Sequence, residues 1–374
     1  MTSRTALVSG DELQTYDLGP THPLRPERVK VALALMKSYG LLHSVAHLQP
    51  RLATESEILL FHSAEYLETV KEYSSRGYGL LDAGDTPAFK GCYEAAGWVV
   101  GASLVAAEAV MNGVSTHAFN LAGGLHHAHP DRASGFCIFN DPAISINFLK
   151  KNYGIKRVAY VDIDAHHGDG VMYGFYNDPS VLDIDLHEDG RYLFPGTGSP
   201  EEIGGGDAAG LKVNIPLPPR TADDVYLEAF EKIVLPAIKG YSPELVMLQS
   251  GADSHRGDLL SHLSITANAY YQVASRIHDL AHELCDGRII VFGGGGYRLS
   301  NVARCWTSVL SAFTKTSIPN ELPRDWQTYY KSISSEEAPT VLMEPADRSA
   351  EETRGRVAEV VRELERSILA RRRW

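Results

Sequence analysis

Short apolar runs alternate with longer, helix-length stretches along most of this 374-residue chain. Five of the runs have the length and residue types of buried β-strands, at residues 116–122, 157–164, 180–187, 244–251 and 288–296. Stretches with helical character lie at 140–154, 223–240 and 266–284. Because strands that alternate with helices form βα units, this order predicts an α/β fold with a mostly parallel central sheet flanked by helices.

The C-terminal part of the chain has a different pattern. No Ser-, Gly- or Pro-rich linker divides residues 1–340, which we expect to form a single domain. Within 341–374, five apolar residues share one helical face among charged neighbours: Val357, Val360, Val361, Leu364 and Ile368. The pattern predicts an amphipathic helical extension docked on the domain, and an arm that binds a partner is the alternative that periodicity leaves open.

Charge and cysteine content exclude several classes of protein. The 35 basic and 47 acidic residues give a formal net charge of −12, and without a long basic stripe we expect no nucleic-acid partner. The four cysteines form no CxxC pair and are predicted to be reduced thiols: Cys92, Cys137, Cys285 and Cys305. The N-terminus lacks the apolar core of a signal peptide, and the most apolar stretch, 97–113, carries Glu108. We therefore expect a cytoplasmic protein without a membrane partner, and no oligomeric state is predicted.

Glycines and ionisable residues follow four of the predicted strands. These segments are Gly123–His127, Asp164–Asp169, Gly251–Asp253 and Gly293–Tyr297. In open α/β sheets, ligand sites form outside the carboxyl ends of the strands, and glycine lets the backbone approach a ligand closely. The pattern therefore predicts one active site at the carboxyl ends of the strands.

The segment VDIDAHHGDG, residues 161–170, indicates a metal site. Strand alternation places Asp162, Asp164 and His166 on one side. Asp164, His166 and Asp253 together would give a metal three protein ligands and leave a position open, as catalytic zinc requires. Asp162 would then orient an imidazole. Two carboxylates and one imidazole suit Zn²⁺, and Fe²⁺ or Co²⁺ would also fit. Ordinary acidic turn residues are the alternative for any single aspartate.

Several long motifs, in this order along the chain, carry a family resemblance. They are GGLHHAHPDRASGFCIFND, VDIDAHHGDGV, FPGTG, LQSGAD and GGGGYRLSNVARCW, within a match from about residue 22 to residue 313. The chain resembles the class I histone deacetylase family, and within it the bacterial acetoin-utilisation branch. The resemblance implies an arginase-like α/β fold and zinc-dependent, NAD-independent removal of acetyl groups from lysine ε-nitrogens. It implies acetylated proteins or peptides as substrates, among them metabolic enzymes such as acetyl-CoA synthetase.

The resemblance also implies a role for each residue of the predicted centre. Asp164, His166 and Asp253 would bind zinc. His127 would be the general base and later the acid that protonates the leaving amine, while His126 would stabilise charge.

Three further residues complete the implied machinery. Asp162 and Asp169 would hold His126 and His127 respectively, which fixes their tautomers. The Tyr297 hydroxyl would donate a hydrogen bond to the developing oxyanion.

A substrate channel and its rim follow from the same resemblance. Four residues match positions that line a narrow apolar tube in the family: Gly135, Phe136, Phe194 and Leu260. Such a tube suits the methylene stem of an acyl-lysine. Asp85 matches a rim aspartate that accepts hydrogen bonds from the substrate backbone. Arg28 matches an arginine near an internal cavity, and a structural ion pair is its alternative.

A second segment, LDIDLHEDG at 182–190, nearly repeats the first, but no second ligand set follows it. In the family, the position of Asp185 is often serine, part of a structural potassium site. The corresponding residues here are Asp162, Asp164, His166, Asp185 and Leu186. Aspartate departs from that pattern and would bring more negative charge. A second monovalent site is implied by the positions of Phe175, Asp178 and Val181.

Three rival functions remain at the level of sequence. An arginase-type dimanganese centre would need further aspartates where Gly168 and His255 stand. An acetylpolyamine amidohydrolase would use the same chemistry on a smaller cationic substrate, and the acidic charge is compatible with it. A silent acyl-lysine binding module would be expected to lack Tyr297, His127 or a zinc ligand, and all of these are present.

Overall fold

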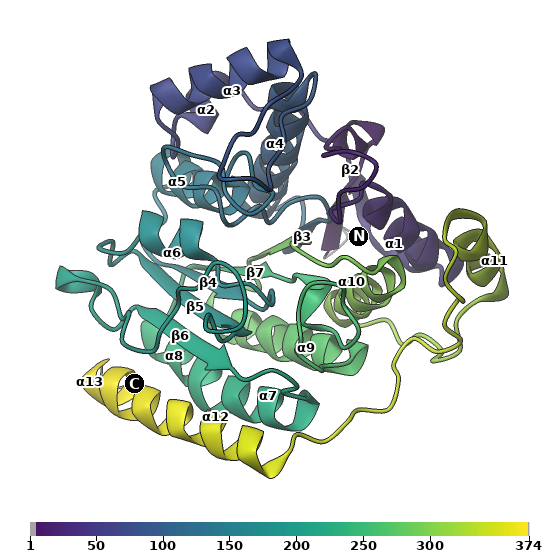
Figure 1. Cartoon of the computed structure of the whole chain (residues 1–374). Coiled ribbons are helices and arrows are strands. Elements are labelled where there is room, and N and C mark those ends of the chain that lie inside the picture. Colours follow the sequence, from purple (N-terminus) through teal and green to yellow (C-terminus); the bar gives the residue numbers. More distant parts are fainter. Residues whose placement is uncertain (1–4, 373) are drawn as a thin grey trace.

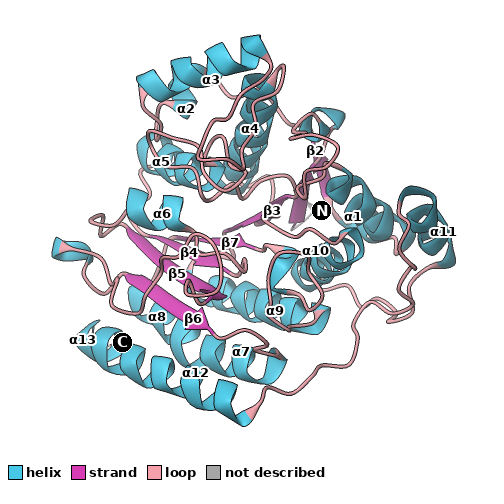
Figure 2. Cartoon of the chain, in the orientation of Figure 1, coloured by secondary structure: helices cyan, strands magenta, loops and turns pink. Residues whose placement is uncertain are grey.

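An eight-stranded sheet runs through the middle of the molecule (Figures 1 and 2). The computed structural model describes residues 5–372 and 374. All seven strand pairs are parallel, and the order is β2-β1-β3-β8-β7-β4-β5-β6. The strands are β1 Thr5–Val8, β2 Ala46–Leu48, β3 His117–Asn120, β4 Val158–Asp162, β5 Val181–Glu188, β6 Lys212–Leu217, β7 Leu245–Gln249 and β8 Ile289–Phe292. The predicted α/β fold with a parallel central sheet is confirmed.

The five predicted strands became β3, β4, β5, β7 and β8, and three further strands were not predicted. Strands β1 and β2 have only four and three residues, too few to show a period. Strand β6 contains Lys212 and Pro216, which argue against a central strand. Because β6 lies at the edge of the sheet, proline is tolerated there.

Helices cover both faces of the sheet, as Figure 2 shows. The α-helices are α1 Glu27–Ser38, α2 Glu55–Ile58, α3 Ala64–Arg76, α4 Cys92–Met111, α5 Asp141–Tyr153, α6 Asp169–Gly174, α7 Asp223–Ala229, α8 Leu235–Tyr241, α9 Ala267–Leu284, α10 Leu299–Thr314, α11 Arg324–Ile333, α12 Glu351–Leu364 and α13 Ala370–Arg372. Alternation along β4 sends Ala159 and Val161 into a core with α1, α7–α10 and α12. Val158 and Tyr160 enter a second core with α3–α6. Alternate residues of the same strand therefore pack against the helices on opposite faces of the sheet.

The predicted helical stretches also form helices. Asn140 caps the start of helix α5, where its side chain accepts a hydrogen bond from the Ala143 N–H at 2.9 Å, and Gly154 follows the last residue of the helix in the left-handed conformation. The stretch 223–240 forms α7 and α8, joined by a π-helical turn at Phe230–Val234. Helix α4 is long and apolar enough to cross a membrane, but 72% of its 18-residue window is buried inside the protein. It therefore packs as a core helix.

The C-terminal segment lies along α7 and β6 (Figure 1). Residues 344–350 have no regular structure and lead into α12. On α12, Val357, Val361 and Leu364 are buried in the core shared with α7, and Val360 is half-buried. A division of the chain at residue 340 remains a prediction.

Candidate metal centre and active site

The four predicted strand exits lie side by side. They follow β3, β8, β7 and β4, which are consecutive neighbours in the sheet. Their carboxyl ends therefore bring the segments that begin after Asn120, Phe292, Gln249 and Asp162 to one place. Geometry of the sheet alone explains why residues more than 100 positions apart in sequence meet.

Asp164, His166 and Asp253 converge at the centre of this edge. The His166 Nδ1 lies 3.1 Å from Asp164 Oδ1 and 3.0 Å from Asp253 Oδ2. One ligand atom from each residue lies within 4.8 Å of the others, and all three residues are buried. The Gly295 N–H donates to Asp164 Oδ2 at 2.7 Å, and the Ala165 N–H donates to Asp253 Oδ1 at 2.8 Å. These backbone contacts hold both carboxylates in fixed orientations.

The electrostatics of these three residues favour a cation between them. Burial and the neighbouring Asp164 carboxylate raise the pKa of Asp253 to about 7. Burial opposes a charge on His166, yet the carboxylates of Asp164 and Asp253 raise its pKa well above its usual range. The two buried carboxylates thus favour a positive charge between them, at the place where the His166 Nδ1 lies. The donor set of two carboxylate oxygens and one imidazole fits a divalent transition metal.

Two glycines leave room for these ligands. A Cβ atom on Gly251 would lie 1.9 Å from Asp164 Oδ2, and one on Gly295 would lie 2.2 Å from Asp253 Oδ2. Neither distance is possible for real atoms, so any side chain here would displace a carboxylate. Close approach of the backbone to the centre is therefore why glycine stands at both positions.

Two histidine–aspartate pairs stand beside the centre. The His126 Nδ1 lies 2.7 Å from Asp162 Oδ2, and the His127 Nδ1 lies 2.7 Å from Asp169 Oδ1. The two Nε2 atoms are 3.1 Å apart, and His126 Nε2 is 4.0 Å from Asp164 Oδ1. Each carboxylate fixes the tautomer of its imidazole, so that both Nε2 atoms face the reaction space.

The two imidazoles differ in their affinity for a proton. Burial would lower the pKa of His126, but the carboxylates of Asp162 and Asp164 outweigh it and raise this pKa to about 9. Burial and then the neighbouring His126 lower the pKa of His127 to about 4. The environment therefore favours the neutral form of His127, which can accept a proton, and favours a positive charge on His126.

Sequence reasoning missed the residues that hold these pairs. Asp169 also accepts from His129 Nε2 at 3.1 Å, and Tyr160 donates to Asp162 at 2.8 Å. The Asp141 carboxylate accepts the N–H groups of Gly124 and Leu125, which fixes the turn that leads into His126. The sequence feature that could have indicated Asp141 is the Asn140–Asp141 pair at the end of the first long motif. Polar residues of this kind begin helices, and here the Asp141 side chain also hydrogen-bonds the neighbouring loop.

Tyr297 faces the centre from the glycine-rich loop after β8. Its ring centroid lies 6.2 Å from that of His166, and the side chain is 7% exposed. Burial and then the Asp253 carboxylate raise the pKa of Tyr297 well above its usual range, so the hydroxyl keeps its proton. Among the described residues, none hydrogen-bonds this hydroxyl. Asp258, not predicted, accepts from the Tyr297 N–H at 2.8 Å and the Leu260 N–H at 3.0 Å.

Arg28 supports the same loop from the side of α1. Its Nη1 donates to the carbonyls of Gly294 at 2.9 Å and Gly296 at 3.0 Å, and its guanidinium lies 5.5 Å from the Trp306 ring centroid. The described contacts of Arg28 are thus with carbonyls and an aromatic ring rather than with a carboxylate partner. Arg28 positions the loop that carries Tyr297.

The predicted channel residues lie outward from the two histidines. Gly135 and Phe136 have φ values of 52° and 70°, a left-handed conformation that is uncommon for a bulky residue and is held by Thr86 Oγ1, which accepts the Phe136 N–H at 3.0 Å. A Cβ on Gly135 would lie 2.5 Å from the His127 ring, so the backbone itself forms this wall. The Phe194 ring lies 5.1 Å from the His127 ring.

A surface hollow of about 580 Å³ is lined by Asp85, Gly135 and Phe194, among others, where the mouth of the channel is predicted. Asp85 is exposed, and Phe194 is 43% exposed. Leu260 is half-buried and packs against the same core cluster as Phe136. The hollow thus brings Asp85 together with two of the four predicted wall residues, Gly135 and Phe194, and the channel itself stays a prediction.

The residues of the first predicted potassium site lie around the end of β5. Asp185 pairs in register with Asp162 of β4, and Leu186 follows it. The Asp185 Oδ2 accepts the Gly168 N–H at 3.1 Å, while the buried Oδ1 has no hydrogen-bond partner among the described residues. Burial and the carboxylates of Asp162 and Asp183 raise the pKa of Asp185 well above its usual range. The Asp185 Oδ1 lies 3.5 Å from the Nδ1 of His187, and burial lowers the pKa of that imidazole to about 4, so little positive charge from the chain faces this carboxylate.

The second predicted monovalent site contains a side chain that sequence reasoning did not foresee. Phe175 and Asp178 precede β5, which begins at Val181. The ammonium of Lys212 donates to the Val181 carbonyl at 2.6 Å and lies 3.5 Å from the Asp178 carbonyl. Burial lowers the pKa of this fully buried lysine to about 8.

Comparison with known proteins agrees with the arrangement of the site. The Histone deacetylase domain family matches residues 22–313. The acetoin utilization protein AcuC of Bacillus subtilis (strain 168) is 40% identical over 352 residues, covering 92% of this chain and 90% of that protein. AcuC of Staphylococcus aureus (strain MRSA252) is 38% identical over 90% of this chain and 89% of its own length, and AcuC of Staphylococcus xylosus is 35% identical over 91% and 90%. The chain therefore belongs to the histone deacetylase family, as a deacetylase similar to AcuC.

Proposed function

We propose that this deacetylase is a zinc-dependent, NAD-independent hydrolase of ε-acetyl-lysine. The observation that carries the proposal is the juxtaposition of a three-ligand centre with two oriented imidazoles whose Nε2 atoms lie 3.1 Å apart. Asp164, His166 and Asp253 would hold the metal, for which Fe²⁺ and Co²⁺ are the other candidates. When bound there, the metal would supply Lewis-acid polarisation of the acetyl carbonyl and activation of water.

The protein side chains then divide the proton transfers. His127, neutral and held at Nδ1 by Asp169, accepts the proton of the attacking water at Nε2 and later gives it to the leaving lysine nitrogen. His126, held by Asp162, keeps a positive charge beside the developing negative charge. The Tyr297 hydroxyl donates to the oxyanion that forms from the acetyl carbonyl.

The channel supports an acyl-lysine on a protein or peptide as the substrate. Backbone and rings at Gly135, Phe136 and Phe194 offer apolar walls to a methylene stem that has no hydrogen bonds to make. Asp85 at the exposed mouth would accept N–H groups of the substrate backbone. We propose acetylated metabolic enzymes, such as acetyl-CoA synthetase, as targets in the cytoplasm, where four buried free cysteines would stay reduced.

We also propose that potassium binds beside Asp185, together with Asp162, Asp164, His166 and Leu186. The buried Asp185 Oδ1 without a hydrogen-bond partner supports a cation at this place. Such an ion would stabilise the turn after β4 that carries both Asp164 and His166.

One observation favours an acetylpolyamine as a second candidate substrate. Two carboxylates, Asp82 and Asp85, line the hollow at the channel mouth and could bind an amine. The test is steady-state hydrolysis of an acetyl-lysine peptide and of acetylputrescine with zinc present and NAD absent. Faster turnover of the peptide, abolished by a hydroxamate, supports the lysine deacetylase, whereas preference for acetylputrescine would assign the polyamine reaction. Peptide binding without hydrolysis of either compound would contradict both and favour an acyl-lysine binding module.

A further inference from the structure

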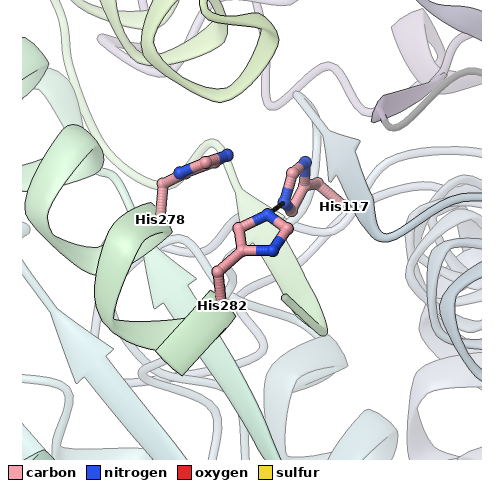
Figure 3. A group of neighbouring side chains, drawn as sticks. All are labelled: His117, His278 and His282. Atoms are coloured by element: carbon pink, nitrogen blue, oxygen red, sulfur yellow. Dashed lines mark hydrogen bonds between the residues drawn. The ribbon is translucent and has the colours of Figure 1, made fainter. Parts of the chain in front are cut away.

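Three histidines come together at the opposite end of the sheet from the active site. His117 is the first residue of β3, whereas the catalytic histidines follow the last residue of this strand. His278 and His282 are one turn apart on α9. Figure 3 shows the rings of His117 and His282 turned toward each other, with His278 beside them.

The spacing of these rings is that of a ligand cluster. The Nε2 atoms of His117 and His282 are 3.1 Å apart, and one ring nitrogen from each histidine lies within 4.8 Å of the others. Ring centroids are 4.5–5.2 Å apart. A tetrahedral metal at about 2.0–2.1 Å from each nitrogen places its ligand atoms about 3.4 Å from one another, so small ring rotations would close the set.

Neighbouring groups orient two of the three imidazoles. The His278 Nδ1 lies 3.0 Å from Asp279 Oδ1, and the His117 Nδ1 lies 3.2 Å from Thr5 Oγ1. A carboxylate or hydroxyl on one ring nitrogen is the usual support of a metal-binding histidine, because it directs the other nitrogen toward the ion. Two histidines four residues apart on one helix face are likewise a recurrent way to bind zinc.

We propose that His117, His278 and His282 form a second site for a divalent transition metal, separate from the catalytic centre. Three imidazoles suit Zn²⁺, Cu²⁺ or Ni²⁺ rather than Mg²⁺ or Ca²⁺, which prefer oxygen. His117 and His278 are buried while His282 is exposed, so the cluster lies at the edge of the protein interior. A metal there would tie the start of β3 to α9 and stabilise the fold. An aromatic cluster is the alternative, since Phe313 lies 5.6 Å from His117 and 6.2 Å from His278.

The experiment separates the two sites in the full-length protein. Asp253→Ala removes a ligand of the catalytic centre, and this metal-free variant is titrated with Zn²⁺ by calorimetry and with Co²⁺ by visible absorption. We expect one equivalent of metal, a tetrahedral Co²⁺ spectrum with nitrogen ligands, and a higher melting temperature with Zn²⁺. Adding His278→Gln and His282→Gln should abolish all three signals.

The control removes two other histidines with the same spacing. His43 and His47 are exposed and lie outside the cluster, so His43→Gln with His47→Gln should leave binding unchanged. If the double variant at α9 does not fold, His282→Gln alone should still weaken Zn²⁺ binding more than about tenfold, since even orienting partners of a ligand are worth that much. Absence of a bound equivalent in the Asp253→Ala protein, or binding that survives loss of His278 and His282, would overturn the proposal.

Discussion

Replacement of Tyr297 by phenylalanine isolates the role proposed for one hydroxyl. The side chain is 7% exposed and packs against Phe136 at a ring distance of 5.8 Å, contacts that phenylalanine keeps. Since no described residue hydrogen-bonds the hydroxyl, its removal leaves no buried partner unsatisfied. The free energy of unfolding should therefore change little. Metal affinity should also stay the same, because the three proposed ligands do not include Tyr297.

The expected loss lies in the chemical step. Removing one donor to an oxyanion costs about 3 kcal/mol of transition-state stabilisation. At about 1.4 kcal/mol per factor of ten, this corresponds to a fall of roughly 150-fold in kcat. KM for an acetyl-lysine peptide should change much less, because the hydrogen bond strengthens only as the oxyanion develops. The assay is steady-state deacetylation, with zinc content measured on the same samples.

Tyr66→Phe provides the matched control. Tyr66 is also buried, and its hydroxyl donates to the Ile138 carbonyl at 2.7 Å, away from the reaction space. Its loss should lower stability by about 1 kcal/mol and leave kcat unchanged. A Tyr297→Phe enzyme with full zinc content and turnover within a few-fold of the native value would refute the oxyanion assignment. An equal fall in kcat for both variants would show that the effect is not local.

Three further changes test other parts of the site. Asp253→Ala removes one of three proposed ligands, and metal analysis of the purified variant should show one zinc equivalent fewer than the native protein; an unchanged count would contradict the ligand set. Gly251→Ala places a Cβ atom where Asp164 Oδ2 now lies, so zinc affinity should fall more than about tenfold while the fold persists by circular dichroism. Lys212→Met removes the buried ammonium that donates to the Val181 carbonyl, and loss of this charged hydrogen bond should lower the free energy of unfolding in urea by about 2 kcal/mol; an unchanged midpoint would argue against that role.

Much of the fold could be predicted because its strong patterns are local. The runs that became β4 and β7 are almost continuously apolar, as is typical of strands buried on both faces, and the stretch of α9 repeats its apolar residues at helical spacing. Short edge strands such as β2 carry no such signal. Their existence depends on pairing with β1, which is a tertiary contact.

The residues of the candidate site also fall into two groups, those with a local sequence pattern and those that only tertiary contacts identify. The residues proposed to carry the chemistry stand in motifs at strand ends, so Asp164, Asp253 and Tyr297 could be named from the sequence. Asp258, by contrast, holds the loop of Tyr297 through the backbone N–H of a segment 39 residues away. Nothing local in the sequence distinguishes Asp258 from an ordinary loop aspartate, because its two N–H partners are specified by the fold.

The role of the buried Lys212 could not be predicted from the sequence, because its partners lie on another strand. Lys212 pairs in register with Asp183, and both residues are buried within the sheet. Of the neighbouring carboxylates, Asp162 lies 2.7 Å from the His126 Nδ1, and the charge of Lys212 opposes the effect of burial on the pKa of Asp183. The Asp185 carboxylate accepts the Gly168 N–H with one oxygen, and the other oxygen lies 3.5 Å from the Nδ1 of His187, whose pKa burial lowers to about 4. We therefore propose that the cation beside Asp185 comes from solution, whereas the carbonyls of the other predicted monovalent site already face the ammonium of Lys212.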